Sequence, residues 1–316
     1  MRLYSVLAAC SCVSLAIAQP ASLKTPELGF AWDGRSQQIR PIHGIPGAAI
    51  LGEGSAITEF ASATIAPRHD LALVVSAADG KVQAMRLASG DMLAIPGLAA
   101  DPSRLVFSPS GTAALAVGSK LQLLTGLPNS PAVQDLAIPA DSNATTAVAV
   151  NDDAQFVLFS TWLLAPGAAP VPLSVPSPIA VSAFLPGSRD AVAIGSDGAI
   201  YRILNSNFPG EVRQVFAADE RTADPVAVRV SADGSRLYSA NRLGTLAVID
   251  LAAASLETVQ CGCSPNAIEP MTSSDLYRIT EISDRPVMLF DVSTPTPRIW
   301  FVPADARLAD SKRSAR

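Results

Sequence analysis

A short turn motif recurs along the chain, each time directly after an apolar run. The first residues of its copies are Ile65, Phe107, Val150, Phe184, Val230 and, in a weaker sixth copy, Met271. Successive copies lie 42, 43, 34, 46 and 41 residues apart. A period of about 40 to 50 residues is typical of four-stranded propeller blades. The repetition therefore predicts an all-β chain, built as a ring of similar antiparallel sheets.

The residues between two copies agree with this fold. In the clearest copy, turns separate four short segments rich in Val, Leu, Ile and Ala, at residues 225–230, 236–240, 245–251 and 256–261. The turns contain Asp, Asn and Gly, which tolerate positive φ at low cost. Many of the predicted strands are apolar nearly throughout instead of alternating, which indicates burial on both faces, as neighbouring blades impose.

The number of blades depends on how the ring closes. Residues 59–303 hold about six repeats, and residues 28–52 hold two or three further strands. An open ring would expose sheet edges, so strands from both termini are expected to close it. Residues 298–305 resemble a first strand with its turn, and we expect them to join the N-terminal strands in a composite seventh blade. Seven blades in one domain, residues 28–304, are predicted; six blades with an N-terminal cap are the alternative.

The first 18 residues read as a signal peptide. Arg2 precedes an apolar run over residues 3–17, and Ala18 ends a small-x-small cleavage site before Gln19. Cleavage there predicts export to the periplasm or beyond, with residues 19–27 as a linker and residues 305–316 as a disordered tail.

Two alternatives stay open for this segment. A retained membrane anchor would need about 20 apolar residues, and the run is shorter and is followed by Pro20. Residues 7–10 (Leu-Ala-Ala-Cys) resemble the lipobox of bacterial lipoproteins, which would place processing at Cys10. No other segment is long and apolar enough to cross a bilayer, so the mature chain is expected to contain no transmembrane segment.

Two cysteines remain after cleavage, Cys261 and Cys263, with one residue between them. They could close a small disulfide ring outside the cytosol, and such a ring is easier to reduce than an ordinary structural bridge. We interpret the pair as a local structural staple or as two buried thiols. A redox switch or half of a soft-metal site is the alternative, but a metal would need further ligands, and the chain has only two histidines.

One repeat carries a resemblance to a known family. Residues 230–241 (VSADGSRLYSAN) and 245–251 (TLAVIDL) resemble the YVTN-type repeat of bacterial, lactonase-like β-propellers, and the other repeats match it in outline. Residues 29–33 (GFAWD) through 46–48 (PGA) also resemble uncharacterised secreted proteins of acidobacteria that carry degenerate propeller repeats. The first resemblance implies a lactonase-like site in the central channel. Lactonase-like propellers use His, Glu and Arg side chains or a calcium ion there, and no position of this chain matches those motifs one by one.

Composition and residue inventory exclude several functions. With 49% hydrophobic and 16% charged residues, the chain is too apolar to be disordered. The net charge of −5 argues against nucleic acid, which needs a concentrated basic face. A Ser-His-Asp site has only His43 and His69 to draw on, and the G-x-S-x-G pattern is missing. Asp152 and Asp153 are adjacent, and we interpret them as solvated turn residues. We expect no catalytic residues, cofactor or metal.

A few charged residues stand within predicted strands. Arg229 on an innermost strand could project into the central channel and bind an anion, Glu269 occupies a comparable position, and Arg202 lies on a third strand. A charged group among apolar neighbours needs water, a partner or a ligand, and an ion pair that lines the channel is the structural interpretation.

Two functions follow from these observations. We expect a binding module without enzymatic activity, whose partner is a protein, a glycan or a small molecule; a lactonase-like hydrolase is the alternative. Two or more carboxylates with an Arg or Asn in the channel would favour the enzyme, and an apolar lining would favour the scaffold.

Overall fold

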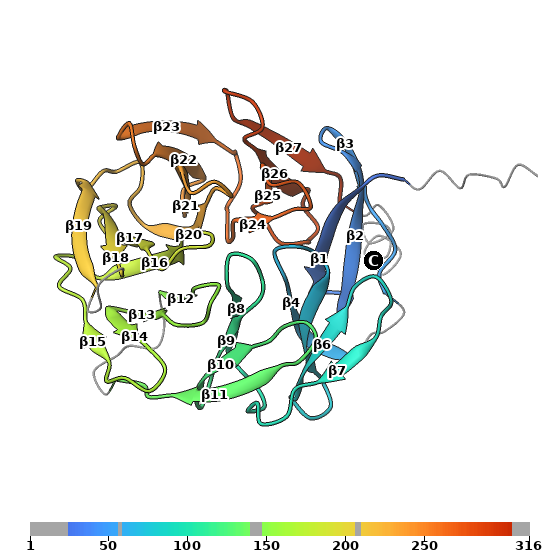
Figure 1. Cartoon of the computed structure of the whole chain (residues 1–316). Helices are drawn as coiled ribbons and strands as arrows, with labels where there is room; N and C mark the ends of the chain where they lie inside the picture. Colours follow the sequence, from blue (N-terminus) through green and yellow to red (C-terminus); the bar gives the residue numbers. More distant parts are fainter. Residues whose placement is uncertain (1–24, 56–58, 140–146, 206–209, 305–316) are drawn as a thin grey trace, which may run out of the picture.

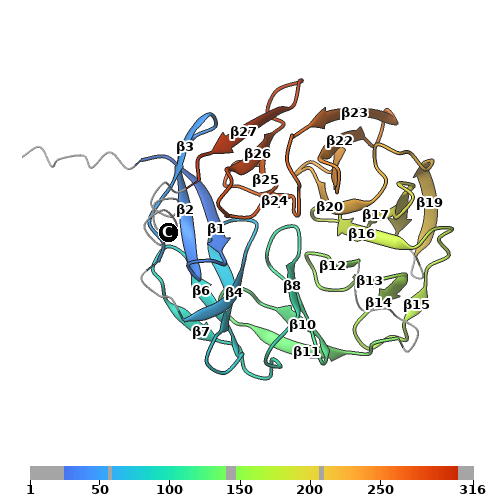
Figure 2. The same ribbon diagram turned by 180° about the vertical axis from the view of Figure 1, so that it is seen from behind.

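The structure, a computed structural model, describes residues 25–55, 59–139, 147–205 and 210–304. Within these residues every regular element is a β-strand, and the strands form seven antiparallel sheets arranged in a ring (Figures 1 and 2). The expected seven-bladed propeller is therefore confirmed. The expected signal peptide, its cleavage site between Ala18 and Gln19, the lipobox Cys10 and the tail 305–316 lie outside the described residues.

We number the sheets as blades 1 to 7 in chain order. Blade 1 has three strands: β1 (Glu27–Asp33), β2 (Gln38–Ile45) and β3 (Ala48–Leu51). In the other six blades the first strand lies innermost; these inner strands are β4 (Phe60–Ile65), β8 (Arg104–Phe107), β12 (Val148–Val150), β16 (Ile179–Phe184), β20 (Pro225–Val230) and β24 (Glu269–Pro270).

The remaining strands of blades 2 to 7 follow outward in chain order. The second strands are β5 (Leu71–Ser76), β9 (Ala114–Val117), β13 (Val157–Phe159), β17 (Ala191–Gly195), β21 (Arg236–Asn241) and β25 (Leu276–Arg278). The third strands are β6 (Val82–Arg86), β10 (Leu121–Thr125), β14 (Trp162–Leu164), β18 (Ile200–Leu204), β22 (Thr245–Asp250) and β26 (Val287–Asp291). The outermost strands are β7 (Met92–Ala94), β11 (Ala132–Leu136), β15 (Val171–Pro172), β19 (Glu211–Phe216), β23 (Ser255–Gln260) and β27 (Arg298–Val302).

The recurring sequence motif forms one recurring turn after the inner strand. In blade 3 the backbone N–H of Ser108 donates to the carbonyl of Ala113, and the N–H of Gly111 donates to that of Ser108. Bonds with the same spacing begin at Ala66, Asn151, Leu185 and Ser231. The fourth residue of the turn adopts positive φ in several blades, at 77° for Gly111 and 56° for His69. The repeat in the sequence is thus a repeat in backbone geometry.

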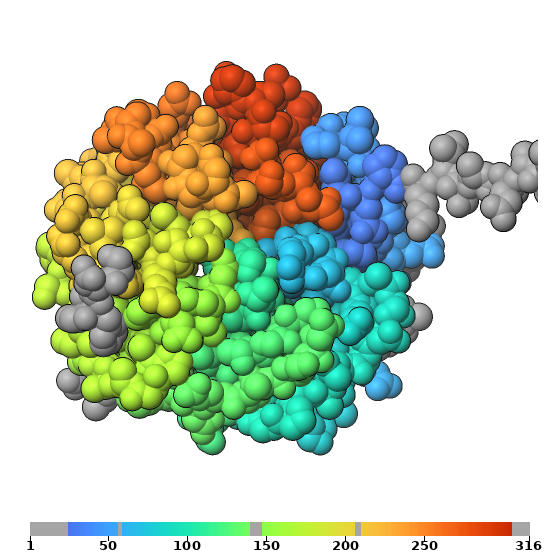
Figure 3. All heavy atoms as spheres, in the orientation of Figure 1, coloured from blue at the N-terminus to red at the C-terminus, as the bar shows by residue number. Residues whose placement is uncertain are grey.

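Apolar side chains fill the space between neighbouring blades. The described residues form seven hydrophobic clusters, one at each contact between consecutive blades and one between blades 7 and 1. Figure 3 shows the blades as successive sectors of the ring in sequence order. Each blade is therefore buried on both faces, which explains why so many strands are apolar without alternation.

The ring closes differently from what the sequence suggested. Residues 298–302 do not join the N-terminal strands in one sheet, because β27 pairs with β26 as the outermost strand of blade 7. Strands from both termini meet instead through side-chain packing, with Leu28 and Ile42 of blade 1 against Leu289 of blade 7. The backbone N–H of Thr272 also donates to the carbonyl of Leu28, at 2.8 Å. A complete blade 7 leaves no unpaired strand to donate, so blade 1 keeps three strands.

Candidate functional site

The inner strands of blades 2 to 7 enclose a central cavity of about 320 Å³. Most of the lining residues are apolar, chiefly Val, Ala, Ile, Leu, Phe and Pro, but polar side chains and backbone atoms supply about half of the surface that faces the cavity. Within the described part of the chain, blade 1 contributes no lining residue. The volume lies at the lower end of the range of roughly 300 to 1,000 Å³ for small-molecule pockets. The channel is therefore the candidate site. Blade 1 packs between blades 7 and 2 and so closes the ring.

Arg229 of β20 lines this cavity and reaches across it. Its Nη2 donates to the carbonyl oxygen of Pro109 at 3.0 Å, although Pro109 belongs to blade 3 and the two residues are 120 positions apart in the sequence. Burial in the channel lowers the pKa of Arg229, and Tyr277, Asp152 and Glu269 oppose that shift through their charges. The sequence-predicted channel residue is thus a half-buried cation at the rim formed by the inner-strand turns.

Glu269 of β24 also lines the cavity, but its partner is not Arg229. Its carboxylate pairs with the guanidinium of Arg278 on the neighbouring strand β25. Arg278 is buried at 5% exposure, and its Nη1 donates to the carbonyl of Thr280 at 2.7 Å. The ion pair lies within blade 7, where it neutralises a buried arginine.

Four polar lining residues were not singled out from the sequence: Thr64, Arg104, Ser182 and Asn266. Arg104 opens the inner strand β8, and burial lowers the pKa of its guanidinium. Ser182 lies in the middle of β16, and its Oγ is buried without a hydrogen-bond partner in the described part of the chain. Arg104 interrupts an inner strand just as Arg229 does, so the same argument would have found it. A lone serine in a strand gives no comparable signal.

Few of the described lining residues can take part in acid–base chemistry. Glu269 is the only carboxylate among the described lining residues, and none of them is a histidine. No described side chain forms a hydrogen bond with the Oγ of Ser182, as a base that activates a nucleophile would. The described residues contain no cluster of three or more His, Cys, Asp or Glu side chains able to hold a metal ion. In the same part of the chain no helix has the length and apolarity of a membrane span. The lining can bind a ligand and offers positive charge to it.

Neither histidine lines the cavity. His43 is half-buried in β2 of blade 1, and no partner among the described residues reaches its buried Nδ1. His69 follows β4 and is 8% exposed. Its Nδ1 accepts from the N–H of Phe30 at 2.9 Å, and its Nε2 lies 2.7 Å from the carbonyl oxygen of Pro270. Because Nδ1 accepts a hydrogen bond, Nε2 carries the proton and donates. His69 therefore joins blades 1, 2 and 7.

Asp152 was expected to be a solvated turn residue, and this expectation is wrong. Its Oδ1 accepts from the N–H and the Oγ of Ser110 in blade 3, both at 2.7 Å, and its Oδ2 accepts from the N–H of Gly187 in blade 5 at 2.8 Å. Burial raises the pKa of this half-buried carboxyl, but the hydrogen bonds outweigh burial and the net shift is downward. Asp152 thus ties three consecutive blades together. Asp153 is exposed, as expected, and pairs with Arg189 at 3.4 Å.

Arg202 does not line the channel and forms its contacts within blade 5. On the third strand β18, its Nη2 forms an ion pair with Asp190 at 3.1 Å. The Asp190 carboxylate also accepts from the backbone N–H of Asn205 at 3.1 Å. Arg202 therefore stabilises its own blade.

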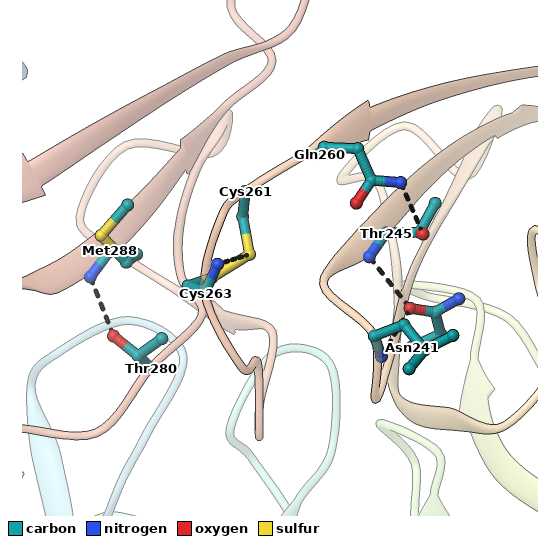
Figure 4. Close-up of a disulfide and its surroundings, with 8 residues drawn as sticks. Asn241, Thr245, Gln260, Cys261, Cys263, Thr280 and Met288 are labelled. Carbon is teal, nitrogen blue, oxygen red and sulfur yellow. Dashed lines mark hydrogen bonds between the residues drawn. A yellow bond between two sulfur atoms is a disulfide. The ribbon is translucent and has the colours of Figure 1, made fainter.

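Cys261 and Cys263 lie in the connection from blade 6 to blade 7, directly after β23 (Figure 4). Their sulfur atoms are joined, and Cys261 is 7% exposed. The N–H of Cys261 donates to the carbonyl of Gly244 at 3.0 Å. A Cβ at Gly244 would lie 2.5 Å from the carbonyl oxygen of Cys263, so the cysteine turn packs tightly on this hairpin. The pair lies apart from the residues that line the cavity.

Comparison with known proteins shows the fold and no family. A structure from Bacteroides fragilis, described as a candidate 6-phosphogluconolactonase, is 14% identical and covers 91% of this chain and 98% of its own, with a TM-score of 0.60. A protein of the same description from Bacteroides uniformis is 14% identical, with 88% and 96% covered and a TM-score of 0.58. Hsv2 of Kluyveromyces lactis is 14% identical, with 88% and 98% covered and a TM-score of 0.52.

No family model and no curated protein matches the sequence. The structural neighbours include bacterial proteins described as candidate 6-phosphogluconolactonases, in keeping with a YVTN-type resemblance. They also include a yeast protein of another name, as expected for a fold that carries many functions. The resemblance to secreted acidobacterial proteins stays a prediction.

Proposed function

We propose that this protein is an exported propeller that binds a small molecule in its central channel without turning it over. The observation that carries the proposal is the lining itself: within the described residues, a cavity of about 320 Å³ is lined by apolar side chains, by two arginines and a few uncharged polar side chains, and by a single carboxylate that is already paired with Arg278. Apolar walls with a few polar groups are typical of ligand sites. Hydrolysis would need a base or a metal in addition.

Lactone hydrolysis is the second candidate function. The fold neighbours described as candidate 6-phosphogluconolactonases favour it. It is the weaker candidate because likeness of fold alone does not carry an activity. It also requires a proton acceptor that the described lining residues lack, apart from the paired Glu269.

A substitution that fills the channel tests the binding proposal. Thr64 lines the cavity, is half-buried and belongs to no hydrophobic cluster, so Thr64→Phe should occupy the cavity at little cost to the ring. Thr64→Val keeps the original volume and is the matched control. We expect fragments of neutral, anionic and sugar type, screened by thermal shift, to include some that raise the melting temperature of the wild type and of Thr64→Val but not of Thr64→Phe. Equal shifts for all three proteins would mean that binding occurs elsewhere.

The same proteins separate binding from hydrolysis. Lactones incubated with the wild type in a weakly buffered indicator solution should release acid no faster than in buffer alone. A catalysed rate that disappears in Thr64→Phe and persists in Thr64→Val would establish the hydrolase in place of the binding module.

Export is part of the proposal and rests on the N-terminal sequence. The mature chain of a natively expressed sample should begin at Gln19, as read by N-terminal sequencing or intact mass. A mature chain that starts at a lipidated Cys10 would indicate a lipoprotein, and an uncleaved chain recovered in the membrane fraction would indicate a retained anchor.

A further inference from the structure

The guanidinium of Arg229 has few hydrogen-bond partners among the described residues of the channel. A guanidinium has five N–H donors. For Arg229 the described residues supply one acceptor, the carbonyl oxygen of Pro109, and no carboxylate within ion-pair distance. A charge in a low-dielectric site needs a counter-charge or water.

The two carboxylates that act on Arg229 from a distance are engaged elsewhere. Glu269 pairs with Arg278 inside blade 7. Asp152 uses both of its oxygens on Ser110 and Gly187. With these bonds in place, neither carboxylate lies within ion-pair distance of Arg229, so the position of the counter-ion is open to a ligand.

The recurring turn shows how much room lies beside this arginine. Arg229 stands two residues before the first residue of its turn, Ser231. The corresponding residues of the other inner strands are Thr64, Val106, Ala149, Ala183 and Glu269. Four of these five side chains are small or aliphatic, and all line the cavity. A compact apolar body therefore fits at the level of Arg229.

A second cation stands across the channel. Arg104 belongs to blade 3, the blade that Arg229 reaches, and lies four residues before its turn residue Ser108. Two residues of strand correspond to about 6 to 7 Å along the channel, so the arginines lie at adjacent levels. Together they give the cavity a positive field that attracts an anion.

We infer that the channel binds a small organic monoanion, a carboxylate with a compact apolar body, whose charged group lies on Arg229 in the field of Arg104. This inference rests on the proposed function, because it names the ligand class of the same channel. A planar guanidinium matches a carboxylate with two parallel hydrogen bonds. A sugar acid fits less well because, at the level of Arg229, its hydroxyl groups would mostly face the small or aliphatic side chains of Val106, Ala149 and Ala183.

Isothermal titration with four probes tests the ligand class on the wild-type protein. Benzoate should bind, whereas benzamide, which has the same shape without the charge, should bind at least about 10-fold more weakly. Gluconate and inorganic phosphate should bind more weakly than benzoate. Equal affinity for benzoate and benzamide would overturn the inference, and so would tighter binding of gluconate or phosphate.

Variants of Arg229 locate the site. Arg229→Gln should weaken benzoate binding by about 10-fold or more, and Arg229→Lys should retain part of it. The exposed Arg242 on the same blade supplies the control Arg242→Gln, which should leave the affinity unchanged. Benzoate affinity that is unaffected in a folded Arg229→Gln protein would overturn the inference. If Arg229→Gln fails to fold, the comparison of benzoate with benzamide on the wild type still decides the ligand class.

Failure of this inference is distinguishable from failure of the proposed function. Suppose that neutral fragments bind the wild type but not Thr64→Phe, and that benzoate is not preferred over benzamide. Binding in the channel would then be supported, and the inferred preference for a carboxylate would be refuted. If no fragment binds the protein, both the proposed binding function and the inferred ligand class would be refuted.

Discussion

The Nε2 of His69 lies 2.7 Å from the carbonyl oxygen of Pro270, a residue 201 positions further along the chain. The Nδ1 of the same ring accepts the backbone N–H of Phe30 at 2.9 Å. His69 thus holds the first, second and last blades at the point where the ring closes. Only the neutral ring can make both bonds, because protonation would place a hydrogen on the acceptor Nδ1.

The first prediction concerns acid stability. Burial lowers the pKa of His69 below its ordinary value of 6.5, while the bond to Pro270 and the charges of Glu269 and Asp70 oppose this shift and Arg278 adds to it. Since the folded pKa lies below the unfolded one, the stabilisation is complete above about pH 6.5 and is lost as the pH falls through the folded pKa. Urea unfolding between pH 7.5 and pH 4.5 should show this loss. His69→Phe should be less stable at pH 7.5, by about 1–3 kcal/mol for each backbone group left unpaired, and should lose less on acidification.

His43 provides the control, because the chain contains only these two histidines. His43→Gln should keep the acid dependence of the wild type. An unchanged pH profile in His69→Phe would contradict the assignment.

The second prediction concerns Gly29, which lies against the same ring. A Cβ at Gly29 would come within 2.7 Å of His69 Cε1, and φ at Gly29 is +138°. Gly167 also has positive φ, at +76°, but a Cβ there meets nothing within 4 Å, so Gly167→Ala measures the cost of positive φ with no clash. Gly29→Ala should be more destabilising than Gly167→Ala in urea unfolding, by about 1–3 kcal/mol. If both variants lose the same free energy of unfolding, His69 can move aside without weakening the contacts that close the ring.

The third prediction concerns Asp152. Asp152→Ala leaves the backbone N–H groups of Ser110 and Gly187 without their carboxylate acceptor, and it should cost about 2–3 kcal/mol. The exposed Asp284, whose side chain has no hydrogen bond or ion pair with the described residues, is the control, and Asp284→Ala should cost less than about 1 kcal/mol. Because the pKa of Asp152 is lowered from 3.8, its contribution is present above about pH 3.8 and is lost as the pH falls through the folded pKa. If thermal unfolding shows a similar loss of stability for the two variants, Asp152 does not stabilise the contacts between blades.

The fourth prediction concerns Cys261 and Cys263, two residues apart in the sequence. A bridge that closes so short a loop restricts the unfolded chain little, so it should contribute no more than about 2 kcal/mol. A chain that begins at Gln19 should lose at most this amount in urea when a reductant is added, and a double Cys→Ser variant should not respond to the reductant. Two free thiols titrated in the denatured, unreduced protein would contradict the bridge.

The blade repeat could be predicted from the sequence because local signals carry it. In blade 6 the predicted strands 225–230, 236–240, 245–251 and 256–261 agree with β20 to β23 within one residue at each end. Turn chemistry and apolar runs act over a few residues, so they can be read along the chain.

The closure and the channel contacts could not be predicted in the same way. The partners of Arg229, His69 and Asp152 are backbone groups of other blades, up to 201 residues away, and backbone groups leave no pattern in a sequence. Residues 298–302 could in principle pair with β26 or with the N-terminal strands. The local sequence of this strand does not distinguish the two pairings, and in the structure it pairs with β26. Arg229 and Glu269 were found because a charge in an apolar strand is itself a signal, whereas Ser182 gave none.

We infer that the channel holds an organic anion against Arg229. A crystal of the protein soaked with 4-bromobenzoate would show directly whether it does. Anomalous scattering from bromine locates the ligand independently of how the density is interpreted. We expect one strong bromine peak inside the cavity enclosed by the inner strands of blades 2 to 7, with the carboxylate on the guanidinium of Arg229. A peak elsewhere on the protein with an empty cavity, or the carboxylate turned away from Arg229, would contradict it.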